Sequence, residues 1–169
     1  MGRPDHPTEP QFSLHTDQDA AREAAARLFQ RVATELKNLL PDTAEVRHIG
    51  ATAVPGCLTK GDLDLVVRVP ADAFDAAERA LASRFPRNVG SKRTDSFSAF
   101  EDPDTNPHLG VQLVMAGSED DVFHLFLDAL LREPDLVGAY NALKRKFAGQ
   151  PMETYRQAKD AFIREVLAR

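Results

Sequence analysis

The stretch from His48 to Leu65, HIGATAVPGCLTKGDLDL, decides the fold. It reads as the end of one strand, a loop of small residues around Pro55 and Gly56, and the start of a second strand. The second strand, over residues 62–69, ends in an apolar run that is typical of a buried strand. We therefore expect two strands joined by a small-residue loop at the centre of the molecule.

Helical and strand patterns extend outward from this centre. Apolar residues at helical spacing predict a helix over 17–40, with Thr16 or Asp17 as its N-cap and Pro41 at its end. The further expected elements are strands over 44–49, 97–100 and 109–115 and helices over 71–84, 119–132, 135–148 and 151–168. This order predicts an α+β fold, with a small mixed β-sheet covered by helices and a C-terminal helical segment.

The chain divides into a short tail and one domain. Residues 1–16 are predicted to be a polar, proline-rich tail, because three prolines fall within the first ten residues. Residues 17–169 are predicted to form a single domain, since their number lies within the usual range for one domain.

The charge balance limits the class of partner. The 21 Lys and Arg residues against 26 Asp and Glu residues give a net charge of −5, which disfavours long nucleic acid and anionic membranes as partners. No apolar run is long enough to span a membrane, and the single cysteine, Cys57, excludes an internal disulfide. A cytoplasmic location is therefore expected. A small phosphorylated ligand stays compatible, because it needs only a local basic cluster.

Asp62 and Asp64 are the candidate metal-binding and catalytic residues. Residues two apart in a strand point to the same face, so the two carboxylates are expected side by side. Each raises the pKa of the other unless a cation lies between them. Mg²⁺ or another divalent cation accepts such oxygens and also binds substrate phosphates. The pair therefore predicts metal-assisted nucleotidyl or phosphoryl transfer.

Phosphate contacts are expected from the loop and from nearby basic residues. The turn over Gly50, Ala51 and Thr52 would let backbone N–H groups approach a phosphate. Lys60, just before the acidic pair, or Arg93 would neutralise phosphate charge. The expected partner is therefore a nucleotide or another phosphorylated small molecule.

Several motifs resemble the GrpB family. Residues 47–56, RHIGATAVPG, are similar to its signature, and the likeness continues at 117–118, 126–134, 139–144 and 155–163, so that it spans about residues 44–167. The resemblance implies the nucleotidyltransferase fold of the polymerase-beta superfamily. Its motif is an apolar residue, Gly, and Gly or Ser, followed by acidic-apolar-acidic on a strand. Ile49-Gly50-Ala51 and Asp62-Leu63-Asp64 match it, with Ala51 in place of Ser or Gly.

The chain also departs from the family pattern. Asp62 replaces an apolar family residue, which brings the acidic pair closer to the superfamily's metal motif. Gly110 and Gln112 stand where the family has His-x-His, on the strand that often carries the superfamily's third carboxylate. Leu127, Ala129 and Leu131 replace polar family residues. Lys144 and Lys159 match family positions, and the resemblance leaves open whether they line the pocket or lie on the surface.

Three hypotheses follow. In the first, the protein is a Mg-dependent nucleotidyltransferase-like enzyme. In the second, it is a catalytically inactive member of the fold that binds a small phosphorylated ligand or a protein, which Ala51 and the missing third acid favour. A carboxylate from a neighbouring strand near the acidic pair would favour the enzyme, and an amide there would favour the binder. In the third, helices 119–168 form a homo-oligomer interface. The apolar residues Leu127 and Leu131 suggest this interface.

Overall fold

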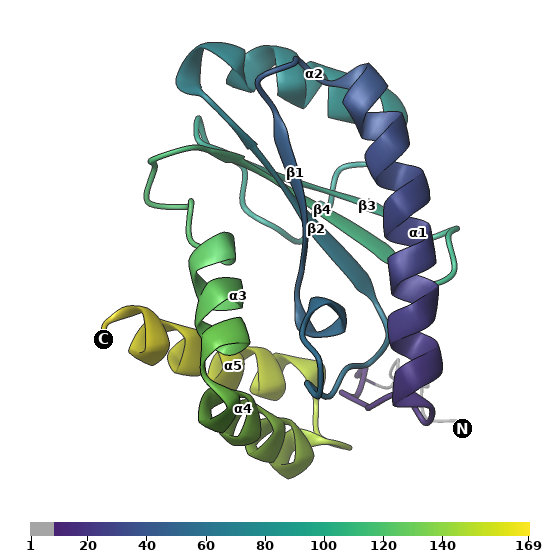
Figure 1. The fold of residues 1–169 in the computed structure, drawn as a ribbon, viewed down its shortest axis with the longest axis vertical. Coiled ribbons are helices and arrows are strands. Elements are labelled where there is room, and N and C mark those ends of the chain that lie inside the picture. Colours follow the sequence, from purple (N-terminus) through teal and green to yellow (C-terminus); the bar gives the residue numbers. More distant parts are fainter. Residues whose placement is uncertain (1–8) are drawn as a thin grey trace, which may run out of the picture.

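The computed structural model describes residues 9–169, which form a four-stranded mixed sheet and five α-helices (Figure 1). The helices are α1 (Gln18–Leu39), α2 (Phe74–Arg84), α3 (Phe123–Arg132), α4 (Pro134–Phe147) and α5 (Met152–Leu167). The strands are β1 (Glu45–Ile49), β2 (Leu63–Val69), β3 (Phe97–Asp102) and β4 (Leu109–Met115), with short 3₁₀ turns η1 (Ala51–Ala53) and η2 (Ala71–Ala73). The predicted α+β fold class, a small mixed sheet with a C-terminal helical segment, is confirmed.

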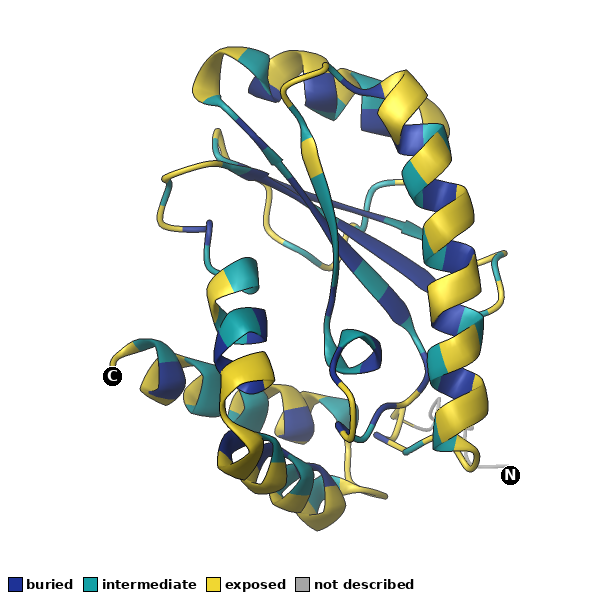
Figure 2. Ribbon diagram, viewed as in Figure 1, coloured by how far each residue is buried: buried dark blue, intermediate teal, exposed yellow. Residues whose placement is uncertain are grey.

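The strand order places β2 and β4 at the centre of the sheet. The order is β1-β2-β4-β3, with β2 and β4 parallel and the two outer pairs antiparallel. In this register Asp64 of β2 lies between Ile49 of β1 and Gly110 of β4, and Glu101 of β3 lies beyond Gly110. Figure 2 shows that the central strands are buried over most of their length. The acidic motif therefore lies at the start of β2, a buried central strand of the sheet.

The two faces of the sheet carry different helices. Alternate residues of β2, such as Leu63, Leu65 and Val67, pack with α1 and α2 in one apolar cluster. The other face of β2 carries Asp64 and Val66, and Val66 belongs to a second cluster with α3, α4 and α5. Figure 1 shows these three C-terminal helices gathered at one end of the sheet, beside the loop that contains η1. Asp64 therefore faces the C-terminal helices rather than α1.

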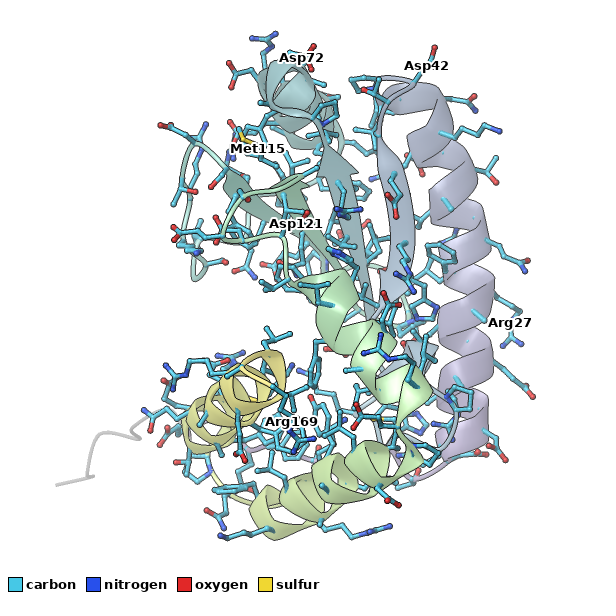
Figure 3. All side chains as sticks on the ribbon, turned by 60° about the vertical axis from the view of Figure 1, so that its left-hand side comes forward. Arg27, Asp42, Asp72, Met115, Asp121 and Arg169 are labelled. Atoms are coloured by element: carbon cyan, nitrogen blue, oxygen red, sulfur yellow. The ribbon has the colours of Figure 1, made fainter. Side chains whose placement is uncertain are left out.

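Side chains set the helix boundaries where the pattern alone does not. The side chain of Asp17 accepts a hydrogen bond from the Ala20 amide at 3.0 Å, so α1 begins where the N-cap prediction placed it. By contrast, α3 begins at Phe123 and not at 119. Asp121, labelled in Figure 3 where the chain leaves the sheet, binds Arg68 through both carboxylate oxygens at 2.7 Å and accepts from the Gly117 amide at 2.9 Å. These bonds hold a turn there instead of a helix.

The N-terminal segment, residues 9–16, is the described part of the predicted tail over 1–16, and it packs on the domain. Phe12 is 2% exposed and stacks on Tyr155 of α5, with ring centroids 3.7 Å apart. The Phe12 amide donates to the Gln150 carbonyl, and the His15 amide donates to the Thr59 carbonyl. The part of the predicted tail over residues 1–8 lies outside the described residues. The described part is docked on the domain, because it has an aromatic side chain to bury and backbone partners to bond.

Within residues 9–169, none of the helices combines the length and the apolar character that crossing a bilayer requires.

Candidate functional site

A cavity of about 390 Å³ lies where the end of the sheet meets the C-terminal helices. Its polar lining includes Asp62 and Asp64, with Lys60 from the preceding loop and Lys159 from α5. Its apolar wall includes Phe126 and Leu130 of α3 and Ile163 of α5. The volume falls at the small end of the range of roughly 300–1,000 Å³ for small-molecule sites. The cavity therefore suits one small molecule with both a charged and an apolar part.

Two glycines flank the carboxylate of Asp64. A Cβ added at Gly110 would lie 2.6 Å from Asp64 Oδ1, and one added at Gly50 would lie 3.2 Å from Asp64 Oδ2. Gly50 also has a φ of +76°, which side-chain-bearing residues rarely adopt. Both glycines are therefore required for the carboxylate to occupy its present place. The sequence marked Gly50 through its motif, but the need for Gly110 appears only in the strand register.

The charges around Asp64 oppose one another. Burial of the Asp64 carboxyl raises its pKa, and the charge of the neighbouring Asp62 also raises it. The nearby cations Lys159 and Lys60 act in the opposite direction and lower the pKa. The net result is a pKa above the ordinary value, chiefly because burial disfavours the charged carboxylate.

A polar row crosses the sheet beside the cavity. Lys60 Nζ lies 3.1 Å from Asp62 Oδ2, and His108 Nδ1 lies 4.0 Å from the same oxygen. His108 Nε2 lies 3.3 Å from Glu101 Oε2 on the far strand. Lys60 and Asp62 therefore lie together, with His108 and Glu101 next to them.

The hydroxyl of Thr52 holds the loop and does not face the cavity. Thr52 is buried, and its Oγ1 donates to the Asp62 carbonyl at 3.2 Å. His48 Nε2 lies 2.8 Å from the same hydroxyl, so the oxygen is available to accept the imidazole N–H. Burial lowers the pKa of His48, which favours its neutral form. Of the three loop residues predicted to contact phosphate, Gly50 and Ala51 line the cavity and Thr52 does not.

Arg93 lies away from the cavity. Its guanidinium binds Glu78 of α2, with Nη2 2.8 Å from Glu78 Oε1. The adjacent Lys92 binds Asp120. Arg93 and its neighbour Lys92 are thus both engaged by acids on other elements, and we leave Arg93 out of the candidate site.

The strand beside the acidic pair offers an amide instead of a third carboxylate. Gln112 of β4 lines the cavity, and Gly110 has no side chain. Within residues 9–169, no group of three or more His, Cys, Asp or Glu residues could together hold a metal ion. Asp62 and Asp64 still fit Mg²⁺, because this ion is commonly held by one or two carboxylates and completed by water and substrate phosphates.

Residues 56–59 of the β1–β2 loop are held from two sides. From α1, Gln18 makes two hydrogen bonds of 2.9 Å with the backbone of Thr59, and Arg22 donates to the Cys57 carbonyl at 2.7 Å. From α4, Asn141 donates to the Gly56 carbonyl at 2.9 Å and accepts from the Leu58 amide at 2.8 Å. Gln18 and Asn141 were missed by the sequence analysis, since polar helical residues carry no signal for a distant loop.

Leu127 and Leu131 of α3 have different surroundings. Leu127 is buried and lines the cavity, so its apolar character belongs to the cavity wall. Leu131 is 48% exposed. The homo-oligomer interface over 119–168 stays a prediction.

Comparison with known proteins places this geometry in a family. The family model described as "GrpB protein" matches residues 19–169. A UPF0157 protein of Vibrio cholerae is 34% identical over 150 residues, which cover 88% of this chain and 79% of that protein. The crystal structure of the conserved protein GrpB from Enterococcus faecalis aligns with a TM-score of 0.64 at 21% identity, covering 85% of this chain and 90% of that one.

A weaker likeness is to the Cid1 poly(U) polymerase in its MgGTP-bound structure. It has a TM-score of 0.46 and 16% identity, over 74% of this chain and 38% of that one. At this TM-score the likeness to Cid1 does not establish a shared fold. The extent of the family match and the identity to the Vibrio relative do establish the family, and the chain belongs to the GrpB protein family.

Proposed function

We propose that this GrpB protein is a cytoplasmic enzyme that carries out divalent-metal-dependent nucleotidyl or phosphoryl transfer on a small molecule. One observation carries the proposal: Asp62 and Asp64 line one cavity together with Lys60, Lys159 and the glycine turn at Gly50. Paired carboxylates beside cations and a tight glycine turn are what a metal-bound phosphate requires. The acidic-apolar-acidic strand and the preceding Ile49-Gly50 also fit the nucleotidyltransferase motif.

Each group has a defined task in this proposal. Asp62 and Asp64 hold Mg²⁺, which when bound neutralises phosphate charge. The backbone at Gly50 and Ala51 faces the phosphate, and the first N–H groups of the η1 turn have no partner within the turn. Lys60, 3.1 Å from Asp62, exchanges this contact for one with phosphate. The cavity volume of about 390 Å³ suits a nucleotide-sized molecule.

Loss of the acidic pair is expected to abolish metal-dependent nucleotide binding. The purified protein is titrated calorimetrically with each nucleoside triphosphate in the presence of Mg²⁺. The wild type should bind, and Asp62→Asn/Asp64→Asn should bind at least tenfold more weakly. The matched control is Asp72→Asn/Asp75→Asn, which neutralises two exposed acids outside the cavity and should bind like the wild type. If the wild type and the Asp62/Asp64 variant behave alike, the proposal fails.

Gly110→Ala is expected to weaken metal-dependent binding by about tenfold with little loss of stability. The new methyl group would lie 2.6 Å from Asp64 Oδ1, and the end of that side chain would have to move away from its place in the cavity. Gly138→Ala on α4 is the control, since a Cβ there meets no atom within 4 Å. The readouts are the titration above and the midpoint of urea unfolding. Unchanged binding by Gly110→Ala would contradict the placement of Asp64.

A second candidate is a non-catalytic module that binds a small phosphorylated ligand. The amide of Gln112, which lines the cavity where a third carboxylate was sought, favours it. The two candidates differ in turnover. Under conditions where a nucleoside triphosphate binds, release of pyrophosphate or phosphate that Asp64→Asn abolishes supports the enzyme. Binding without any release supports the module.

A further inference from the structure

We propose that Lys144, Lys159, Tyr140 and Tyr155, on the α4–α5 side of the cavity, bind an anionic group of the ligand, a phosphate monoester or a carboxylate. This group of four residues is called the anion cluster below. All four line the same cavity as Asp62 and Asp64. The inference rests on the cavity being a ligand site, but it needs no metal.

Lys144 is a buried cation without a carboxylate partner. It is 3% exposed, and among residues 9–169 neither Lys144 nor Lys159 forms an ion pair with an acid. The ammonium of Lys144 donates to the Leu58 carbonyl and lies 3.5 Å from Cys57 Sγ. An ammonium has three N–H donors, so one remains for the cavity that Lys144 lines. A buried charge without an opposite charge beside it destabilises the folded protein.

Lys159 adds a second positive charge to the same place. Burial, together with the charge of Lys159 and against an opposing effect of Cys57, lowers the pKa of Lys144 to about 8. Lys144 is thus still largely protonated at neutral pH, and the positive charge of Lys159 lies near it. A ligand anion between the two ammonium groups would offset both charges. Within the described residues no acid forms an ion pair with either lysine, and Asp64 is the acid whose pKa the charge of Lys159 lowers.

The two tyrosines complete the cluster with neutral donors. Burial raises the pKa of Tyr140 and that of Tyr155, so both phenols keep their protons at neutral pH. The Lys144 ammonium lies 4.0 Å from the centre of the Tyr140 ring. Two cations and two hydroxyl groups around one cavity form a set of donors that suits an oxyanion.

The wall next to the anion cluster is apolar and partly aromatic. Phe126 and Leu130 of α3 and Ile163 of α5 line it. The Phe126 ring packs against Tyr140, with ring centroids 5.5 Å apart. The ligand class that meets both surfaces is a small aromatic or apolar body that carries a phosphate monoester or a carboxylate.

Binding of simple aromatic anions in metal-free buffer tests this inference. The probes are phenyl phosphate and phenylacetate, with benzyl alcohol as the neutral counterpart, titrated in the presence of EDTA. The wild type is expected to bind at least one of the two anions and to bind benzyl alcohol at least tenfold more weakly. Lys144→Met and Lys159→Met are each expected to weaken anion binding at least tenfold. Lys146→Met, at an exposed position on the same helix as Lys144, should leave binding unchanged.

Further arms separate this inference from the proposed transfer activity. Asp62→Asn/Asp64→Asn removes two negative charges from the cavity and should bind the anions in metal-free buffer at least as well as the wild type does. If this variant also binds Mg²⁺ and nucleotide like the wild type, the transfer proposal alone fails. Titration with inorganic tripolyphosphate identifies which part of the ligand carries the anion. If the wild type binds tripolyphosphate and Lys144→Met does not, the anion cluster binds the phosphate chain of a nucleotide. Binding of the aromatic anions alone assigns it to an acceptor.

Two outcomes overturn the inference. One is that the wild type binds none of the anions at millimolar concentration. The other is that Lys159→Met, at a partly exposed position, binds the anions as the wild type does. Circular dichroism of Lys144→Met shows whether any loss of binding in that variant reflects unfolding, and Lys159→Met decides the question if it does.

Discussion

Replacing Phe12 by alanine is expected to lower the free energy of unfolding by about 3–5 kcal/mol. The Phe12 ring is 2% exposed and stacks on Tyr155 with an interplanar angle of 8°. Its removal leaves a space next to the cavity and frees one face of Tyr155. It also loosens the pairing of Gln11 with Pro151, which joins the N-terminal segment to the start of α5.

Urea unfolding followed by circular dichroism measures this loss. Val89→Ala is the control, because Val89 is 95% exposed and its truncation should change the free energy of unfolding by no more than about 0.5 kcal/mol. A loss below about 1 kcal/mol for Phe12→Ala would mean that the N-terminal segment is not packed on the domain in solution.

The second large effect is a rise in stability above pH 8 that depends on Lys144. The unfolded lysine keeps its proton up to a pKa of 10.5, whereas the folded one loses it at a pKa of about 8, mainly because it is buried. Between these values the unfolded state binds more protons, so the free energy of unfolding rises with pH. The cost of burying the charge is fully present below pH 8 and disappears above pH 10.5, and it amounts to about 3 kcal/mol.

The comparison that isolates this effect is between the wild type and Lys144→Met. Urea unfolding at pH 7, 8, 9 and 10 should show the stability of the wild type rising relative to that of the variant. The titratable groups that face Lys144 are Cys57, Tyr140 and Tyr155 as well as Lys159, and they are present in both proteins. Lys146→Met should run parallel to the wild type. Parallel curves for Lys144→Met would contradict the buried position of its charge.

Local signals in the sequence were enough to place most of the fold. The capping side chain of Asp17 and the apolar run of β2 act within a few residues of themselves, so α1 and β2 follow from the sequence. The beginning of α3 did not follow, because Asp121 bonds to Arg68, which is 53 residues away in the chain. Phe12 was passed over because a lone aromatic among prolines shows no periodicity.

The candidate site was predictable only where its residues are close in sequence. Gly50, Lys60, Asp62 and Asp64 come from one loop and the strand after it, and they line one cavity. Arg93 was predicted from its charge alone, and its partner Glu78 could not be known before α2 was in place. Whether Lys144 and Lys159 faced the cavity could not be decided from helical spacing, since their helices can be placed only by tertiary packing.

The two-sided hold on residues 56–59 has a consequence for the order of assembly. The bonds from α4 to this loop join residues 83–87 positions apart, and those from α1 join residues 35–41 positions apart. Contacts between such distant positions form late, because closing a long stretch of chain costs entropy before any bond repays it. Asp62 and Asp64 are synthesised before the C-terminal helices that line the rest of their cavity. The cavity is therefore complete only after α3, α4 and α5 have packed against the sheet. A partly synthesised or partly folded chain thus carries the acidic motif without an enclosed place to use it.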